Sequence, residues 1–249
     1  MVEGDVAAAN ADPAIRAIEA AHALAFHSGL GSSLFAPSHN SLTTEDVKSF
    51  AKTAFTKGNI AVLGTGIDQA LLTQLVEKSL TGAAAAASAG TTSSATSYFG
   101  GETRIEAHEG PQTVFIGFGS TGAPSAELGA LAAHLSPQPS VKWSKGLSYI
   151  ATVLPEGTSV QSVYLPYTDG TLVGLLVQGT NAANLKEAGK VAVQALKTVS
   201  TPSGITADEL KKAIAKAKFN AASVVESRDG LVSAVGSKVP PYILTSFHD

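Results

Sequence analysis

The chain of 249 residues contains no cysteine. Disulfide bonds, zinc–thiolate sites and thiol nucleophiles are therefore excluded. Aromatic residues make up 6% of the sequence and charged residues 15%, against 44% hydrophobic residues, so alanine and glycine must fill much of the interior. No apolar run approaches the roughly 20 residues of a membrane-spanning helix. The sequence thus predicts no direct membrane span and a core built on close helix–sheet contact.

Neither positive nor negative charge is in large excess. The net charge is −3 and the Lys and Arg residues are scattered, so the basic stripe that neutralises phosphates is missing and we predict no nucleic-acid partner. The first residues carry Glu3, Asp5 and Asp12. They match neither the basic start of a secretory signal nor an Arg-rich mitochondrial presequence. We expect residues 1–11 to be a disordered leader and any targeting sequence to lie outside this chain.

The strands are predicted in two pairs. Charged and apolar residues alternate over 101–108, which indicates an edge strand with one solvent-exposed face. After the turn residues 109–111, the stretch 113–118 is apolar on both sides, as in a central strand of a covered sheet. Residues 160–167 and 172–178 are joined by Thr-Asp-Gly, the pattern of a β-hairpin.

Amphipathic helices are predicted around these strands, because apolar residues recur at helical spacing after capping residues. The predicted helices begin near Asp12, Thr44, Asp68, Pro124, Asn181 and Thr206, and a further short strand is expected over 59–63. Residues 82–97 are a low-complexity stretch of Ala, Ser, Gly and Thr and read as a loop. The predicted class is α+β, a two-layer antiparallel sheet with helices packed on one face.

One formal cofactor motif is present, Gly117-x-Gly119-x-x-Gly122. In a dinucleotide site these glycines form the turn between a strand and a helix, and an acidic residue follows about 20 residues later. Here Gly117 lies inside the apolar strand, and the acidic position is replaced by the sequence PQPS at 137–140. We therefore interpret the glycines as a means of close helix–sheet packing, and predict no cofactor.

The histidines are predicted to be surface or packing residues. They are His22, His27, His39, His108, His134 and His248. His22 and His27 are five residues apart on one predicted helix, so their side chains do not lie on the same face of that helix. Neither the His-x-x-Glu-His zinc motif nor its inverse occurs, so no zinc-peptidase centre can be built. The Gly-x-Ser-x-Gly motif of a nucleophilic serine does not occur either. Ser33, Ser120 and Ser144 have no sequence neighbours typical of a catalytic serine.

Charged side chains form no catalytic constellation in the sequence. The carboxylates Glu102, Glu106 and Glu109 alternate with Arg104, the pattern of a solvated strand face. The lysines 211, 212, 216 and 218 lie on the polar side of a predicted helix. We accordingly predict no catalytic, cofactor-binding or metal-binding residues.

Four stretches carry a resemblance to a known family. They are residues 12–37, 46–68, 98–119 and 140–178, and their most recognisable parts are the Gly-Gly-Glu-x-Arg of 100–104 and the Tyr-x-Asp-Gly of 167–170. In order and spacing they resemble the core protein 2 family of the mitochondrial ubiquinol–cytochrome c reductase, or respiratory complex III, and its fungal members in particular. That family belongs to the processing-peptidase superfamily, also called pitrilysin-like.

The resemblance implies two peptidase-like α+β domains, of which this chain holds a helical remnant of the first (12–58) and a truncated second (59–239), with a tail over 240–249. It implies a structural core subunit, not an enzyme, in fragment form. Such a subunit lies on the matrix side of the mitochondrial inner membrane and pairs with core protein 1 and other complex III subunits. It binds no cofactor or metal and is oligomeric through its peptidase-like faces.

Two other functions stay open at this point. The first is the substrate-binding half of a two-part zinc processing peptidase whose metal site is on another chain. The second is capture of extended peptides along the edge strand 101–108 by strand addition. Under each reading a domain without its complementary half should expose apolar surface and associate.

Overall fold

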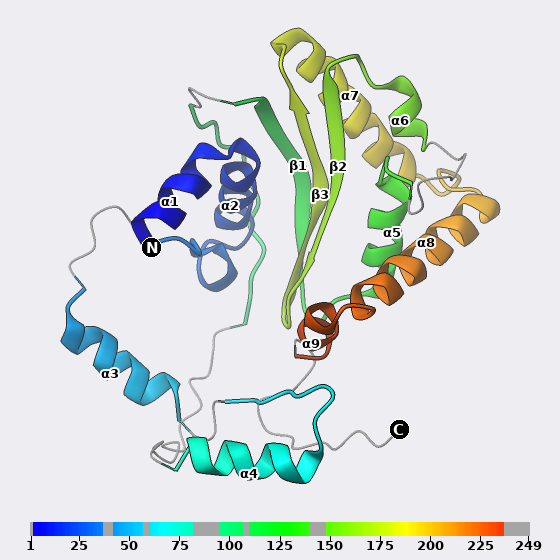
Figure 1. Ribbon diagram of the computed structural model, residues 1–249. Helices are drawn as coiled ribbons and strands as arrows, with labels where there is room; N and C mark the ends of the chain where they lie inside the picture. Colours follow the sequence, from blue (N-terminus) through cyan, green and yellow to red (C-terminus); the bar gives the residue numbers. More distant parts are fainter. Residues whose placement is uncertain are drawn as a thin grey trace. The chain divides into compact units, whose positions relative to one another are not determined.

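A computed structural model describes residues 2–36, 42–56, 60–81, 95–106, 110–139 and 148–236. The chain divides into two compact units (Figure 1). Unit 1 comprises residues 1–38 and 95–221, and unit 2 comprises residues 39–94 and 222–249. The boundaries predicted from the resemblance divide the chain differently and stay a prediction.

Unit 1 is organised around a three-stranded antiparallel sheet in the order β1-β3-β2. The strands are β1 (Gln112–Thr121), β2 (Thr158–Pro166) and β3 (Gly170–Gly179). The predicted hairpin is confirmed: Tyr167 N donates to Gly170 O over 2.8 Å at the turn between β2 and β3. The prediction that 113–118 is a strand is also confirmed, but its central position is wrong, because among the described residues β1 pairs with β3 alone.

The predicted strand 101–108 is not formed over its described part, residues 101–106. Gly100 and Gly101 have φ values of +81° and +148°, so the chain leaves strand geometry just where the pairing would begin. Residues 60–63 of the predicted strand 59–63 likewise form no strand. The remaining residues of both predictions lie outside the described part of the chain.

One face of the sheet is covered by α5 (Ala126–Leu135), α6 (Tyr149–Val153) and α7 (Ala182–Val199). The core on this face consists of Leu135, Ile150, Val160, Leu175, Val177, Leu185, Ala188, Ala192 and Ala195. Four of its nine members come from α7, and three of those are alanine. Small side chains let α7 approach the strands closely, as the composition suggests.

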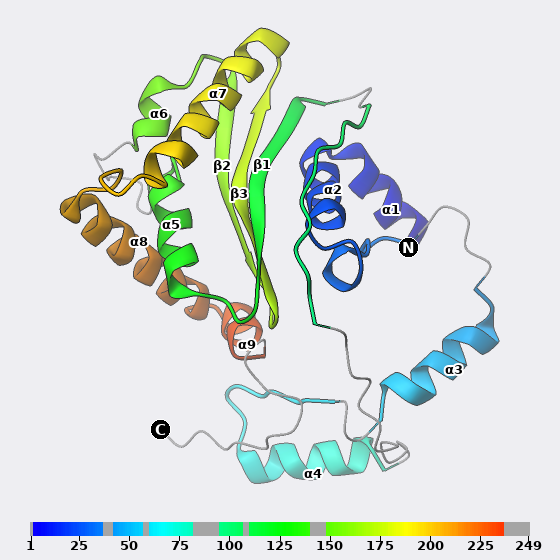
Figure 2. The same ribbon diagram turned by 180° about the vertical axis from the view of Figure 1, so that it is seen from behind.

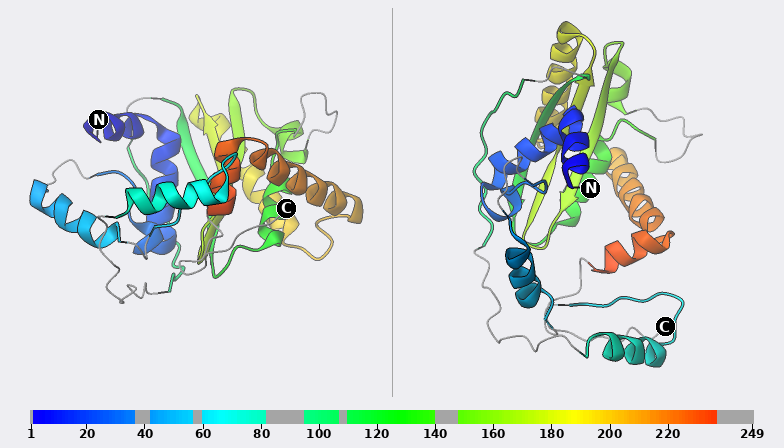
Figure 3. Two further views of the ribbon diagram at one scale, coloured as in Figure 1. Left: turned by 60° about the horizontal axis from the view of Figure 1, so that its bottom comes forward. Right: turned by 60° about the vertical axis from the view of Figure 1, so that its left-hand side comes forward.

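The opposite face is covered by α2 (Pro13–Phe26), so the strands lie between two helical layers (Figures 2 and 3). Ala25, Phe26 and Leu172 are buried here, with Phe115 and Leu165 packed against them. Because strand side chains alternate between faces, Leu172 contacts α2 whereas Leu175 contributes to the α7 side. Helices therefore cover both faces of the described sheet, and not one face as the sequence predicted.

Helix starts follow local capping chemistry. Asp12 accepts a hydrogen bond from Ala14 N at the start of α2, and Asn181 accepts one from Ala183 N at the start of α7. The predicted capping box of α8 (Ala207–Val225) is present: Thr206 N donates to the Glu209 carboxylate over 2.8 Å. A helix, α1 (Val2–Ala11), stands where the sequence analysis expected a disordered leader.

Unit 2 contains α3 (Thr44–Ala54), α4 (Gln69–Ser79) and α9 (Arg228–Gly236). No residue of these three helices is buried. On α3 the predicted apolar stripe is formed but uncovered by the described residues, with Phe50 69% exposed and Phe55, just past the helix, 64% exposed. In neither unit do the described residues include a helix of the length and apolarity that crossing a membrane requires.

Candidate functional site

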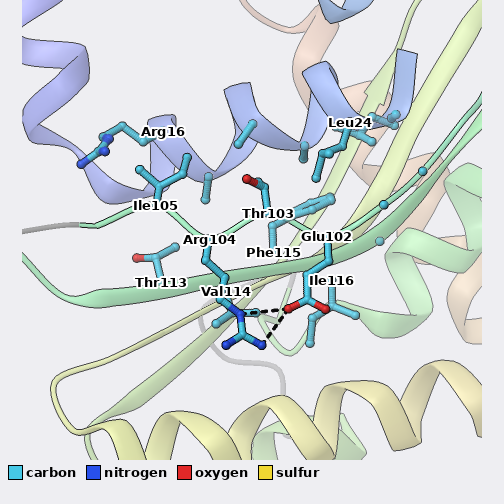
Figure 4. A pocket seen from close by; sticks show the side chains of 18 of the residues that line it. Arg16, Leu24, Glu102, Thr103, Arg104, Ile105, Thr113, Val114, Phe115 and Ile116 are labelled. Carbon is cyan, nitrogen blue, oxygen red and sulfur yellow. Dashed lines mark hydrogen bonds and ion pairs between the residues drawn. The ribbon is translucent and has the colours of Figure 1, made fainter. Parts of the chain in front are cut away.

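A cavity of about 720 Å³ lies in unit 1 between α2 and β1 (Figure 4). Its walls are small side chains of α2, residues of the segment 98–105, and β1 from Gln112 to Phe118. The charged side chains in the lining are Arg16, Glu102 and Arg104. This cavity could receive a ligand or a peptide segment.

The segment that enters the cavity is anchored on the end of α2. Phe99 N donates to Ala25 O over 2.9 Å, and Gly100 N donates to Leu24 O over 3.1 Å. These carbonyls belong to the last turn of α2, where no intrahelical N–H can reach them. The Tyr-Phe-Gly-Gly stretch therefore acts as a C-terminal cap for a helix more than 70 residues away in sequence.

The chain just after α2 is strained. His27 has φ +57° and ψ −70°, and Ser28 N donates to Phe26 O over 2.7 Å, which is the geometry of a classic γ-turn. The imidazole ring stacks on Phe99, with ring centroids 4.2 Å apart and planes at 5°. The stacking and the cap hold this turn, so Phe99 and Gly100 of the motif fix the backbone geometry at the end of α2.

Of the three charged side chains of the cavity, those of Glu102 and Arg104 face solvent, whereas Arg16 Nη2 donates to Glu106 O over 3.1 Å. Arg104 Nη2 lies 2.9 Å from Glu102 Oε1, and the two side chains are 90% and 74% exposed. Such a pair contributes little to stability. Figure 4 shows both side chains directed away from α2, whereas Thr103 and Ile105 point toward it. The predicted solvated face thus applies to Glu102, Arg104 and Glu106, while Glu109 lies outside the described residues.

His22 connects α2 with the β2–β3 turn. Its Nδ1 lies 2.8 Å from Ile18 O, and because a carbonyl only accepts, Nδ1 carries the hydrogen. Its Nε2 lies 2.7 Å from Tyr167 Oη, and the rings meet edge to face at 5.7 Å. Burial raises the pKa of Tyr167, and the nearby carboxylate of Glu19 raises it further. His22 is thus a packing residue, as predicted.

The other described histidines, His27 and His134, lie at the ends of two different helices. His134 is in the last turn of α5, and His39, His108 and His248 lie outside the described residues. Within the described ranges, no three His, Asp or Glu side chains come close enough together to hold a metal ion.

Two glycines of the formal cofactor motif, Gly117 and Gly119, are packing residues, whereas a Cβ added at Gly122 would meet nothing within 4 Å. A Cβ added at Gly119 would lie 3.0 Å from the Phe26 ring of α2 and 2.8 Å from the Tyr98 ring. A Cβ at Gly117 would lie 2.3 Å from Val173 O on the paired strand. Both positions sit within β1 and not in a strand-to-helix turn. The predicted close helix–sheet packing is confirmed for Gly119, whereas Gly117 permits the close approach of β1 and β3 instead.

Sequence reasoning missed the role of Lys216. Its ammonium group donates to Ser136 O over 3.0 Å and to Gln138 O over 2.5 Å, just past the end of α5. A cation there compensates the partial negative charge of the helix end. Burial lowers the pKa of Lys216. Only the spacing of lysines on α8 was visible in sequence, and spacing does not show which helix end a lysine reaches.

Comparison with known proteins identifies the family of this chain. It is 39% identical over 237 residues, 91% of its length, to "Cytochrome b-c1 complex subunit 2, mitochondrial" of Neurospora crassa. It is 34% identical over 243 residues, 95% of its length, to the subunit of the same name from Cryptococcus neoformans. This chain belongs to the cytochrome b-c1 complex subunit 2 family. The chain spans about half the length of these relatives, 51% and 55% respectively.

Family membership agrees with the resemblance predicted from sequence, including its fungal character. The human member of the subunit 2 family is 27% identical over 94% of the chain, which covers 53% of the human subunit. A solved structure, "Complex III2 from Candida albicans, Inz-5 bound", contains a chain with the same fold: the TM-score is 0.76 at 16% identity, over 96% of this chain and 59% of that one. The chain matches no protein-family model.

Proposed function

We propose that this chain is a non-catalytic structural core subunit of the mitochondrial cytochrome b-c1 complex, in fragment form. Its work is contact with core protein 1 and other complex III subunits on the matrix side of the inner membrane, to which it is peripheral. The observation that carries the proposal is the 39% identity, over 91% of the chain, to a protein named as subunit 2 of that complex. In this role the chain needs no cofactor and performs no reaction.

Exposed apolar side chains support a role in protein–protein contact. On α3, Val47 and Phe50 are 60% and 69% exposed, and on α8 the apolar residues Leu210 and Ile214 are also exposed. Contiguous apolar surface on a folded protein marks an interaction site more often than it occurs by chance. The two helices belong to different parts of the chain, so the proposal expects more than one contact with neighbouring subunits.

Import into isolated Neurospora crassa mitochondria tests the proposal. The chain would carry an added targeting sequence and a C-terminal tag, and complex III would be resolved by native electrophoresis after mild detergent extraction. We expect the tag to migrate with cytochrome b. Phe50→Asp should reduce that incorporation because it places a charge on the apolar stripe of α3, whereas Lys48→Asp on the same helix is the matched control. A chain that migrates only as free protein contradicts the proposal.

The alternative is the substrate-binding half of a two-part zinc processing peptidase. The cavity between α2 and β1 is the observation in its favour, since an extended peptide could enter it. The relatives described above are named as subunits of the b-c1 complex, which supports the structural role instead. Chelator-sensitive cleavage of a presequence peptide, seen only when this chain is mixed with a zinc-bearing partner chain, would replace the structural proposal with this one.

A further inference from the structure

Serine or threonine directly precedes proline at two places in the sequence, Ser136-Pro137 and Thr201-Pro202. Proline-directed protein kinases recognise this dipeptide when it is exposed and extended, and proline itself favours extended backbone at the residue before it. The two dipeptides have the same local chemistry but different surroundings. Accessibility therefore distinguishes them.

Ser136-Pro137 is protected by the fold of unit 1. Pro137 is buried and Ser136 is half-buried just past the end of α5. The ammonium group of Lys216 donates to Ser136 O over 3.0 Å, so α8 is fastened over this stretch. A kinase would reach Ser136 only after this contact had broken.

Thr201-Pro202 lies in the connection between α7 and α8 (Figure 1). Thr201, Pro202 and Ser203 are all exposed. Pro202 disfavours helical backbone at Thr201, in agreement with the end of α7 at Val199. The second dipeptide is therefore open to solvent.

The hydroxyl group of Thr201 fastens the end of α7. Its Oγ1 donates to Thr198 O over 2.7 Å, and the neighbouring Ser200 Oγ donates to Leu196 O over 2.8 Å. These carbonyls end the helix and carry its partial negative charge. A Cβ added at Gly204 would lie 2.8 Å from Thr201 Oγ1, so there is no room for even a methyl group on that side of the hydroxyl.

We propose that Thr201 is a phosphorylation site and that a phosphoryl group there opens the C-terminal end of α7. The γ-phosphoryl group of ATP is transferred to Thr201 Oγ1 by a proline-directed kinase. The new P–O bond forms as the bond from the γ-phosphorus to its bridging oxygen breaks; the hydroxyl proton passes to a base of the kinase, and ADP leaves. The inference concerns this chain alone and does not depend on the proposed function.

The phosphoryl group acts on the helix end in two ways. Thr198 O loses its hydroxyl donor, and a charge of about −1.5 to −2 is placed at the negative end of α7, where it is repelled. Lys197 in the same turn is exposed, and an exposed ion pair contributes too little to offset this. Farther along the chain, α8 stays in place through buried Ala213 and Lys216, so the opening is confined to the region around 197–205.

Phosphorylation of the full chain in vitro tests the site. The chain is incubated with ATP and a recombinant proline-directed Ser/Thr kinase, and modified residues are located by tandem mass spectrometry. We expect phosphate on Thr201. Ser136, with the same dipeptide in a protected place, and Ser203, exposed but not followed by proline, should stay unmodified. A chain without phosphate on Thr201, or with as much on Ser136, would overturn the proposal.

Hydrogen exchange of the phosphorylated chain tests the opening. Amides of the last turn of α7 and of residues 200–201 should exchange on the order of tenfold faster than in the unmodified chain. Thr201→Val is the matched control, because it removes the hydroxyl donor without adding charge, and exchange should rise by only about threefold. Unchanged exchange on phosphorylation, or exchange in Thr201→Val as fast as in the phosphorylated chain, would contradict an opening driven by the phosphate charge. Faster exchange around Ala213 would contradict its confinement to the end of α7.

Discussion

Replacing Gly174 by alanine should destabilise the sheet of unit 1. Gly174 and Gly117 are paired across β3 and β1. A Cβ at Gly174 would lie 2.6 Å from Ile116 O, 2.6 Å from Cζ of Phe115 and 2.7 Å from the Cα of Gly117. The Phe115 ring can rotate away, but the carbonyl and the Cα belong to the backbone of β1, so β1 and β3 must separate.

The magnitude follows from that separation. Extra methyl groups in a packed core typically cost about 1–3 kcal/mol. Because backbone atoms and not only a side chain oppose the new methyl group, we expect about 3 kcal/mol for Gly174→Ala. Gly117→Ala should cost a similar amount, since its Cβ would meet Val173 O at 2.3 Å. The double variant should cost less than the sum, because one displacement accommodates both methyl groups.

Urea unfolding followed by far-UV circular dichroism measures this effect. With a slope of about 1–3 kcal/mol per molar for urea, the midpoint for Gly174→Ala should fall by roughly 1–3 M. Gly189→Ala on α7 is the matched control: its Cβ meets nothing within 4 Å, and alanine in a helix should raise stability by about 0.5–1 kcal/mol. A midpoint for Gly174→Ala equal to that of wild type or of Gly189→Ala would refute the reasoning.

Three further predictions concern side chains that join elements. Lys216→Met should lower the unfolding free energy by about 1 kcal/mol in the same urea assay, because two carbonyls at the end of α5 lose their donor; an unchanged midpoint would contradict this. The pKa of Glu209 is lowered by hydrogen bonds from the backbone N–H and then the hydroxyl of Thr206. The resulting stabilisation is present above the ordinary glutamate pKa and is lost as pH falls through the lowered value. Thr206→Ala removes the hydroxyl but keeps the backbone N–H, so it should partly flatten the acid side of a stability-against-pH series. Tyr167→Phe should cost about 1 kcal/mol and speed hydrogen exchange in α2, because His22 loses the partner of its Nε2; unchanged exchange there would count against a docking role.

Features with a local cause could be predicted from the sequence. The turn at Asp169-Gly170 and the capping box of Thr206 and Glu209 depend on residues within four positions of one another, and both are present. The strand 113–118 was also recognisable, since it is apolar on both sides. The position of this strand in the sheet could not be recognised from the sequence. An edge strand covered by α2 at Phe115 and by the α7 layer at Ile116 is as apolar as a central strand.

Features decided by distant contacts could not be predicted. The alternation in 101–106 predicts a strand, but the preceding Phe99 and Gly100 bind the end of α2, and no local pattern encodes that contact. The bond between His22 and Tyr167 joins positions 145 residues apart, and Lys216 reaches Ser136 across 80 residues. In the candidate site the sequence correctly indicated packing glycines, while the cavity itself arises from the spacing of α2 and β1.

The layer formed by α2 has a consequence for how the molecule tolerates breaks in its chain. This helix is joined to its sheet through the whole of 39–94, which belongs to the other unit, so non-covalent contacts alone hold it against β1. Each doubling of such a connection adds only about 0.6 kcal/mol of closure entropy. A tryptic cut after Lys78 would consequently leave two pieces that co-purify and, once separated, reassemble by fragment complementation.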